Sequence, residues 1–338
     1  MYCTPSPYEI VIDTRVGGIE RHYLGGREDI NMLIPDDFIK CVTFLGVSTE
    51  EHGQESISWK ATAFAVSVPS EFAPDKSYNY LVTARHVVEK GESTKLRIRV
   101  NRRKDKTAVT LNIENQDYHW WYHPMTKPED LDYADVAVLP WIPPREYELV
   151  TLPIDMFLTD EIIQNKGIGL GNEVFITGLF TRLAGKERNI PIVRTGNIAM
   201  MLNEPIYTRY DTPDGTKDGF MDAYLIESRS IGGLSGSPVF VIQHGYDKEL
   251  LSKGQIGRHL YLLGLIHGHW PVQPSKIEDL GIVDDKATEQ INMGIAIVVP
   301  AKRILEAINQ PELVEMRKEG DKEYKRLFSP TPDKQNRK

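Results

Sequence analysis

Two stretches decide the fold class: WKATAFAVSV at residues 59–68 and YNYLVTARHVV at residues 78–88. Both are rich in β-branched and aromatic residues, and the turn-forming stretch SEFAPDKS separates them, which is typical of neighbouring strands. Further strand-like stretches follow along the chain, at residues 39–47, 95–101, 107–115, 136–141, 173–180, 190–201, 223–230, 237–243, 259–270 and 293–300. Because helices do not alternate with these stretches, we expect an all-β protein of two antiparallel barrels or sandwiches.

A proline-rich stretch, PWIPPREYELVTLP at residues 140–153, divides the strand-like stretches into two groups. Proline cannot continue a strand ladder, so such a stretch is typical of a connection between domains. AKRILEAIN at residues 301–309 places its apolar residues on one helical face and predicts a terminal helix. We expect four parts: an N-terminal extension at 1–37, a first β-barrel at 38–145, a second β-barrel with the terminal helix at 146–309, and a charged tail, a solvated helix at its start, at 310–338.

The composition is that of a folded globular protein, with 41% hydrophobic and 26% charged residues. The net charge of −8 argues against nucleic acid or an anionic membrane as a partner. Cys3 and Cys41 are the only cysteines, so we expect a reducing, cytoplasmic compartment rather than a disulfide scaffold. No apolar run reaches the roughly 18 residues of a membrane helix, and the N-terminal sequence lacks the pattern of a signal peptide.

Three residues with complementary chemistry lie at the ends of strand-like stretches. His86 follows the apolar stretch LVTAR, Asp135 directly precedes the apolar stretch VAVL, and Ser235 lies between glycines in GGLSGSPV. A serine hydroxyl becomes a nucleophile when a base takes its proton, and a histidine oriented by a buried carboxylate is such a base. The three residues therefore predict a catalytic triad, in which the backbone amides of Gly233 and Ser235 stabilise an oxyanion.

Each of these signals has a simpler interpretation when it is taken alone. A GxSGxP string is often a turn before a strand, and a single histidine after a strand is usually structural. Asp130 and Asp132 compete with Asp135 for the role of the acid, but neither directly precedes the apolar stretch. The joint occurrence of the three residues, in this order, favours the triad.

The motifs TARH (83–86), ADVAVL (134–139) and GGLSGSPV (232–239) closely resemble the three active-site signatures of chymotrypsin-like serine peptidases, nearest to the bacterial trypsin-like peptidase domain group. The order His, Asp, Ser is that of this family and not that of subtilisin-like enzymes or α/β-hydrolases. The resemblance covers about residues 38–309. It implies two six-stranded antiparallel β-barrels with a C-terminal helix, and a serine endopeptidase that acts on proteins or peptides without a metal or organic cofactor.

The resemblance also implies residues that contact the substrate. LLGLIHGH (262–269) resembles the strand that lines the primary specificity pocket, so His267, Gly268 and His269 are candidate substrate-binding residues. Arg229 lies at the position that often forms the floor of this pocket, where it would favour an acidic side chain, although a salt bridge elsewhere is an alternative. His267 and His269 would share one face of a strand and could together hold zinc, but no set of further ligands accompanies them.

The sequence also departs from familiar members of the family. Leu234 stands where digestive enzymes carry an aspartate that pairs with a newly cut N-terminus, and the cysteine pairs of secreted members are missing. The basic run RVNRRKDK at residues 99–106 lacks aromatic neighbours and is interpreted as the tip of a hairpin, not as a nucleic-acid site. Two other functions compete with the peptidase: a peptide-binding module of the same fold without turnover, and an esterase-type hydrolase.

Overall fold

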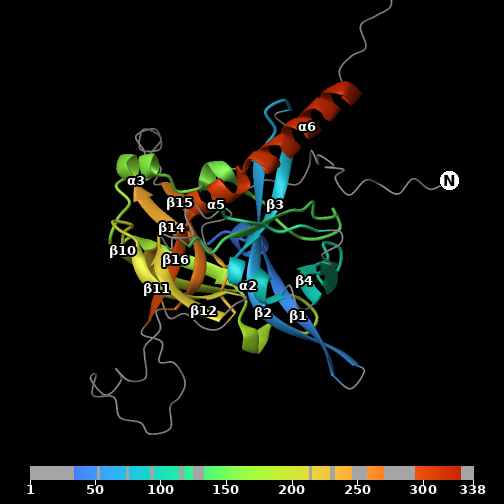
Figure 1. Cartoon of the computed structure of the whole chain (residues 1–338), viewed down its shortest axis with the longest axis horizontal. Helices are drawn as coiled ribbons and strands as arrows, with labels where there is room; N and C mark the ends of the chain where they lie inside the picture. The colour runs from blue at the N-terminus through green and yellow to red at the C-terminus, as the bar shows by residue number, and fades with distance from the viewer. Residues whose placement is uncertain are drawn as a thin grey trace, which may run out of the picture.

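The structure is a computed structural model. It describes residues 34–51, 54–73, 76–91, 95–113, 118–124, 133–212, 215–228, 233–245, 257–269 and 294–328. Strands dominate this part of the chain, which confirms the expectation of a mainly β protein. Figure 1 shows a blue sheet from the first half of the chain beside a yellow and orange barrel from the second half.

The first half forms one antiparallel sheet in the order β5-β4-β1-β2-β3-β7-β6, and a short eighth strand, β8, runs parallel to β2. Its strands are β1 (Val42–Glu51), β2 (Gln54–Pro69), β3 (Ser77–Thr83), β4 (Lys95–Asn101), β5 (Ala108–Ile113), β6 (Trp121–Tyr122), β7 (Ala137–Pro140) and β8 (Leu152–Pro153). Strand β2 is buried on both faces because its side chains alternate between two cores. Phe64 and Val66 pack toward the second half of the chain, whereas Ala63 and Ala65 pack inside the sheet.

The expected six-stranded barrel at residues 38–145 is not shown. Within the described residues, β5 pairs only with β4 and β6 pairs only with β7, so the sheet has two ends and does not close. Strand β6 has two residues, and such a short strand offers few backbone groups for closure. The first half is therefore described as a sheet of eight strands.

The second half contains a closed six-stranded barrel in the order β10-β13-β16-β15-β14-β9. Its strands are β9 (Glu173–Gly178), β10 (Ile192–Met200), β13 (Tyr224–Glu227), β14 (Pro238–Gly245), β15 (Gly257–His269) and β16 (Ile295–Pro300). Each strand contributes buried apolar side chains to one core, for example Ile176, Ile226, Val241, Leu263 and Val298. This half bears out the barrel that the sequence predicts.

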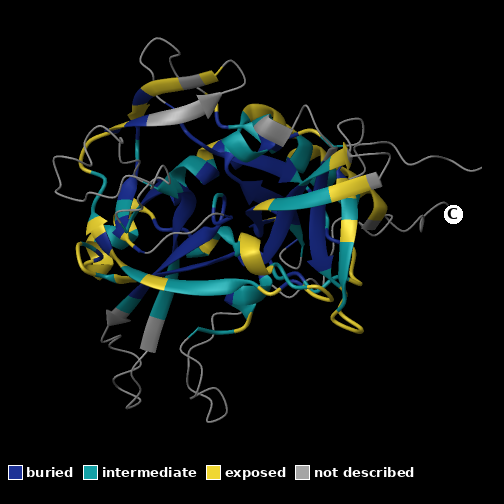
Figure 2. Cartoon of the chain, turned by 90° about the horizontal axis from the view of Figure 1, so that it is seen from below, coloured by how far each residue is buried: buried dark blue, intermediate teal, exposed yellow. Residues whose placement is uncertain are grey.

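A third core joins the sheet to the barrel. Phe38 packs edge-on against Phe175 and Phe240, with ring centroids 5.8 and 4.8 Å away, and these two rings stack at 4.9 Å. Figure 2 shows the buried residues as a continuous dark-blue interior across both halves. Burial of apolar area is the main favourable term in folding, so this shared core holds the two halves together as one unit.

Helices and one hairpin complete the described fold. They are α1 (Asp37–Lys40), α2 (Arg85–Gly91), η2 (Ile154–Met156), α3 (Asp160–Lys166), η3 (Thr181–Leu183), the two-stranded sheet of β11 (Ile206–Thr212) and β12 (Gly215–Met221), α5 (Ala301–Ile308) and α6 (Pro311–Phe328). The helix expected at 301–309 is confirmed as α5, and the helix expected at the start of the tail is α6, whose Leu313 is fully buried. The strand predicted at 78–88 is too long, because β3 ends at Thr83 and α2 follows.

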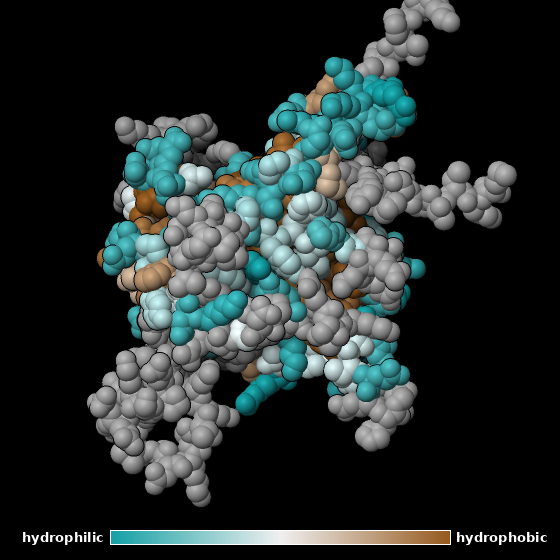
Figure 3. All heavy atoms as spheres, viewed as in Figure 1, coloured by the Kyte–Doolittle hydropathy of each residue, from teal (hydrophilic) through white to brown (hydrophobic). Residues whose placement is uncertain are grey.

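Helix α6 is the longest helix of the described residues, and its surface is mostly hydrophilic (Figure 3). In the part of the chain that the structure describes, no helix has both the length and the apolar character needed to cross a membrane.

Candidate active site

His86 lies just after the end of β3, as the second residue of α2. Its ring Nδ1 lies 2.7 Å from Oδ2 of Asp135, and its backbone N–H donates to Oδ1 of the same carboxylate at 2.9 Å. One carboxylate therefore fixes both the backbone and the ring of His86. The contact also determines the tautomer, because Nδ1 must carry a proton to donate to a carboxylate.

The pairing of β3 with β7 brings Asp135 to this position. Thr83 pairs with Ala137 in antiparallel register, so Asp135, two residues before Ala137, comes level with the start of α2. Asp135 is 0% exposed, as its place before an apolar strand predicts. Its Oδ1 also accepts a hydrogen bond from the hydroxyl of Tyr133 at 3.1 Å. Tyr133 was not predicted from the sequence, although its position two residues before Asp135 allows this contact.

A second imidazole contacts the same carboxylate. His267, on β15, places Nδ1 2.5 Å from Oδ2 of Asp135. The rings of His267 and His86 meet edge to face, with centroids 5.6 Å apart and planes 83° apart. The predicted contact of His267 with substrate stays a prediction, and in the structure its ring lies against the acid of the predicted triad.

These contacts decide the charge of the buried groups. Burial alone would raise the pKa of Asp135, but the charges and hydrogen bonds of His86 and His267 hold it well below its ordinary value. Burial, together with the nearby Asp135 carboxylate, raises the pKa of the Tyr133 phenol. Asp135 is therefore an ionised acceptor at neutral pH, and Tyr133 is a protonated donor.

Ser235 lies on a loop that packs against the first half of the chain. Gly236 has a φ of 78°, in the left-handed region that favours glycine. A Cβ at this position would come 2.3 Å from the carbonyl oxygen of Thr62 and 3.1 Å from the backbone nitrogen of Ala84. The loop thus contacts the end of the strand that leads to His86. The Ser235 hydroxyl donates to the carbonyl oxygen of His267 at 3.4 Å.

Thr62, in the middle of β2, joins the serine loop to the first half. Its backbone N–H donates to the carbonyl oxygen of Ser235 at 3.0 Å, and its hydroxyl donates to the carbonyl oxygen of Gly233 at 3.1 Å. The same hydroxyl accepts from the N–H of Leu179 at 2.9 Å. Thr62 was not predicted from the sequence. The signal that could have found it is a buried threonine within the otherwise apolar run ATAFAV.

For the remaining predicted residues, the structure leaves the predicted roles untested, and some of these residues lie outside the described part of the chain. Gly233 has a φ of 100°, but its proposed amide contact with an oxyanion stays a prediction, as does that of Ser235. Gly268 and His269 lie next to His267 on β15, and burial lowers the pKa of His269. Its ring Nδ1 is buried without a hydrogen-bond partner among the described residues. Arg229 lies outside the described residues, as do Asp130 and Asp132.

Within the described residues, no group of three or more possible metal ligands contains both His267 and His269. Among the described residues, the group that could offer three ligand atoms consists of His86, Asp135 and His267, with those atoms within 4.8 Å of one another. The two ring nitrogens lie 2.7 and 2.5 Å from the same carboxylate oxygen, whereas ligand atoms around a tetrahedral zinc ion are about 3.3 Å apart. The spacing fits direct hydrogen bonds.

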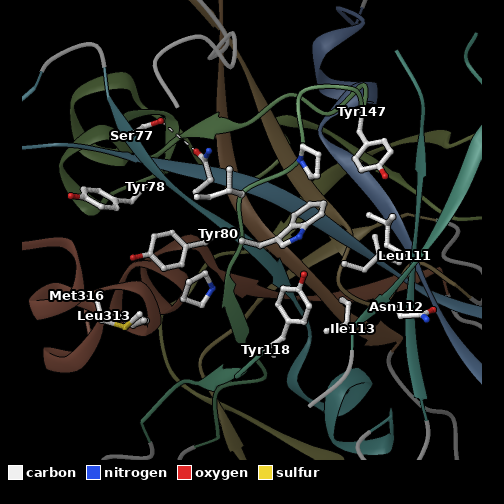
Figure 4. A pocket seen from close by; sticks show the side chains of 16 residues that line it. Ser77, Tyr78, Tyr80, Leu111, Asn112, Ile113, Tyr118, Tyr147, Leu313 and Met316 are labelled. Carbon is white, nitrogen blue, oxygen red and sulfur yellow. Dashed lines mark hydrogen bonds between the residues drawn. The ribbon is translucent and has the colours of Figure 1, made fainter. Parts of the chain in front are cut away.

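A separate cavity of about 420 Å³ lies between the first sheet and the beginning of α6 (Figure 4). Aromatic side chains, including Tyr80, Tyr118 and Tyr147, line it together with Leu313 and Met316. No member of the predicted triad lines this cavity. It is therefore distinct from the site around Asp135.

No family model matches this chain, and a search of curated proteins finds no significant match. The function therefore has to be inferred from the residues of the site themselves.

Proposed function

We propose that this protein is a serine endopeptidase that hydrolyses peptide bonds through an acyl-enzyme. The observation that supports this most is the Asp135 carboxylate, which is fully buried and accepts from both the backbone and the ring of His86. A supporting observation is that His267 contacts both Asp135, through its ring, and the Ser235 hydroxyl, through its backbone carbonyl oxygen. The proposal includes the finer expectation of a chymotrypsin-like fold, with the described barrel as its second half.

In the proposed first step, His86 acts as the base. Asp135 holds the proton on Nδ1, so Nε2 offers its lone pair to the hydroxyl of Ser235. Nε2 takes this proton while Oγ attacks the carbonyl carbon of the substrate, and the carbonyl electron pair moves onto oxygen. The amides of Gly233 and Ser235 stabilise the resulting oxyanion, by about 2.7–4 kcal/mol per donor in comparable sites.

The second half of the reaction returns the proton. His86, now an imidazolium beside the ionised Asp135, gives the proton to the leaving amine as the C–N bond breaks. A water molecule then attacks the ester on Ser235, with His86 again as base, and releases the acid product and the free serine. The low pKa of Asp135 suits this role, because the carboxylate stays charged and stabilises the imidazolium.

The first prediction concerns the nucleophile. Replacing Ser235 by alanine removes the attacking oxygen, so we expect loss of peptide hydrolysis and of covalent labelling by a fluorophosphonate probe, with an unchanged fold by circular dichroism. Ser237→Ala is the matched control, since this buried neighbour has a hydroxyl without a hydrogen-bond partner among the described residues. We expect this control to label normally.

The same assay separates the rival functions. Labelling of wild type and Ser235→Ala to the same extent would contradict the proposed nucleophile. Hydrolysis of a short acyl ester but not of casein or peptides would favour an esterase. Absence of both labelling and hydrolysis in the wild type would favour a peptide-binding module without turnover.

The proposed substrate is a protein or peptide, and the proposed compartment is the cytoplasm. Cys41 is a free, buried thiol that donates to the carbonyl oxygen of Phe38 at 3.3 Å, an environment that is compatible with reducing conditions. An acidic residue before the cleaved bond, recognised by Arg229, is part of the proposal that substrate profiling would test.

A further inference from the structure

The Asp135 carboxylate is held from four directions. Oδ1 accepts from the His86 backbone and from the Tyr133 hydroxyl, and Oδ2 lies within hydrogen-bond distance of the rings of both His86 and His267. Catalysis by a triad uses one imidazole on the acid. The second imidazole, that of His267 on β15, is not explained by that chemistry.

We propose that His267 is a positioning residue of the triad, which donates its Nδ1 proton to Asp135 and thereby fixes the carboxylate in the orientation that holds His86. This inference rests on the proposed function, because it assigns His267 a role in the same reaction. His267 aligns His86 through Asp135 and takes part in no additional chemical step.

The geometry of the carboxylate supports this role. A carboxylate that is held only by the ring it orients can rotate about its Cβ–Cγ bond. Here the backbone of His86 and the hydroxyl of Tyr133 hold one oxygen, and His267 holds the other. The two rings reach Oδ2 from separate elements, α2 and β15, and meet edge to face. With both oxygens anchored, the plane of the carboxylate is fixed.

His267 also connects the acid to the nucleophile. Its ring contacts Asp135, while its backbone carbonyl accepts from the hydroxyl of Ser235 at 3.4 Å. Strand β15 therefore sets the position of Ser235 relative to Asp135 through one residue. A displacement of about 1 Å in such an arrangement can reduce a rate about 100-fold.

The charged groups around His267 define the expected pH effect. Asp135 is the carboxylate in contact with its ring, His86 lies edge to face with it, and Tyr133 donates to the same carboxylate. Behind Tyr133, the Arg85 guanidinium lies 5.7 Å from the phenol ring and pairs with Glu89 at 2.6 Å. A donor on Oδ2 withdraws electron density from the carboxylate, so its removal strengthens the attraction of Asp135 for a protonated His86. The acidic limb of the kcat/KM profile then moves to higher pH.

Two variants separate positioning from packing. His267→Leu keeps much of the side-chain volume and removes the donor, and His267→Asn keeps a donor near the position of Nδ1. For His267→Leu we expect a fall in kcat of about 10- to 100-fold, the usual effect of one hydrogen bond to a charged group, with KM nearly unchanged. For His267→Asn we expect kcat within a few-fold of wild type and an acidic limb near the wild-type pH. His259→Leu, the same change farther along β15, is the control.

Unchanged kcat and an unchanged pH profile in His267→Leu would overturn the proposal. Equal losses in His267→Leu and His267→Asn would also overturn it, because the donor would then not matter. Wild-type labelling by the fluorophosphonate probe is measured first. Its absence contradicts the proposed function, whereas normal labelling with an unaffected His267→Leu contradicts only the role of His267.

A measurement that does not depend on activity completes the test, and it applies even if His267→Leu fails to fold. In ¹⁵N-histidine-labelled wild-type protein, we expect two Nδ1-bound protons with the strong downfield shift of a hydrogen bond to a carboxylate. In His267→Asn, one of them disappears. A single such proton in the wild type would contradict the hydrogen bond from His267.

Discussion

Tyr133 holds the acid of the proposed triad without being a member of the triad. Its hydroxyl donates to Oδ1 of Asp135 at 3.1 Å, and its ring is nearly fully buried. Arg85 lies over this ring and over that of Tyr122, with its guanidinium carbon 5.7 and 4.9 Å from the two centroids. The residue that precedes His86 therefore packs on the residue that supports its acid.

A substitution of Tyr133 tests the role of its hydroxyl. Tyr133→Phe keeps the ring and removes one donor to a buried carboxylate, so we expect kcat to fall about 10-fold and the protein to lose about 1–2 kcal/mol of stability. The measurements are steady-state kinetics and Tm. Tyr207→Phe, which removes the hydroxyl of an exposed tyrosine, is the control and leaves both quantities unchanged. An equal effect of the two changes would contradict the assigned role of Tyr133.

Some of these residues could be predicted from sequence, and others could not. His86, Asp135 and Ser235 adjoin apolar strands, so their residue types and neighbours point to them directly. The contact of His267 with Asp135 could not be predicted, because a position on a strand gives the face of the side chain but not its partner. Thr62 acts through a hydroxyl within an apolar run, and its role depends on a loop far along the chain.

Among the elements, the serine loop is closely enclosed by its neighbours. Gly236 combines a positive φ with close backbone neighbours from β2 and from the residue after β3. The hairpin of β11 and β12 lies near the other side of the site, where the N–H of Tyr133 donates to the carbonyl oxygen of Phe220 at 3.2 Å. This hairpin could not be predicted from the sequence, because its strands, YTRYDT and GTKDGF, lack a repeating apolar position.

Gly236→Ala tests the loop. The new Cβ would lie 2.3 Å from both the Thr62 carbonyl oxygen and the Thr83 hydroxyl, so the loop must move and carry Ser235 with it. We expect a loss of probe labelling of 100-fold or more in a protein that is also less stable. Gly171→Ala is the matched control, because Gly171 has a similar φ of 82° and a Cβ at this position would meet no described atom within 4 Å.

The control experiences the backbone strain alone, which costs about 1–2 kcal/mol. We therefore expect Gly171→Ala to lose some stability and to label at the wild-type rate. Normal labelling of Gly236→Ala would show that the loop does not need its present position.

In the molecule as a whole, the contacts of Asp135 that build the site also join the two halves of the fold. Asp135 connects α2, β7 and β15, which belong to both halves. The mainly β class and the second barrel could be predicted from strand patterns, because apolar runs and turns are local signals. Whether the first sheet closes into a barrel could not be predicted, since this depends on which strands pair at its ends.

Global stability should follow the ionisation of Asp135. Its pKa is lowered on folding, so the charged form stabilises the folded state above the unfolded pKa of about 3.9, and this contribution is lost as the pH falls below that value. We expect the stability advantage of wild type over Asp135→Asn to shrink by about 1 kcal/mol between pH 7 and pH 3. Urea unfolding at both pH values measures it, and parallel pH dependences of the two proteins would contradict it.

The division of the site between two halves has a consequence during synthesis of the chain on the ribosome. His86 and Asp135 are translated well before Ser235 and His267, and α6 comes later still. Once made, α6 attaches to the first sheet, where Arg317 donates to the Tyr80 hydroxyl at 2.8 Å and the Tyr78 hydroxyl donates to the Arg317 carbonyl oxygen at 2.7 Å. A nascent chain would thus carry the proposed base without the proposed nucleophile, and the proposed peptidase could not cleave its neighbours on a polysome before the barrel has been synthesised.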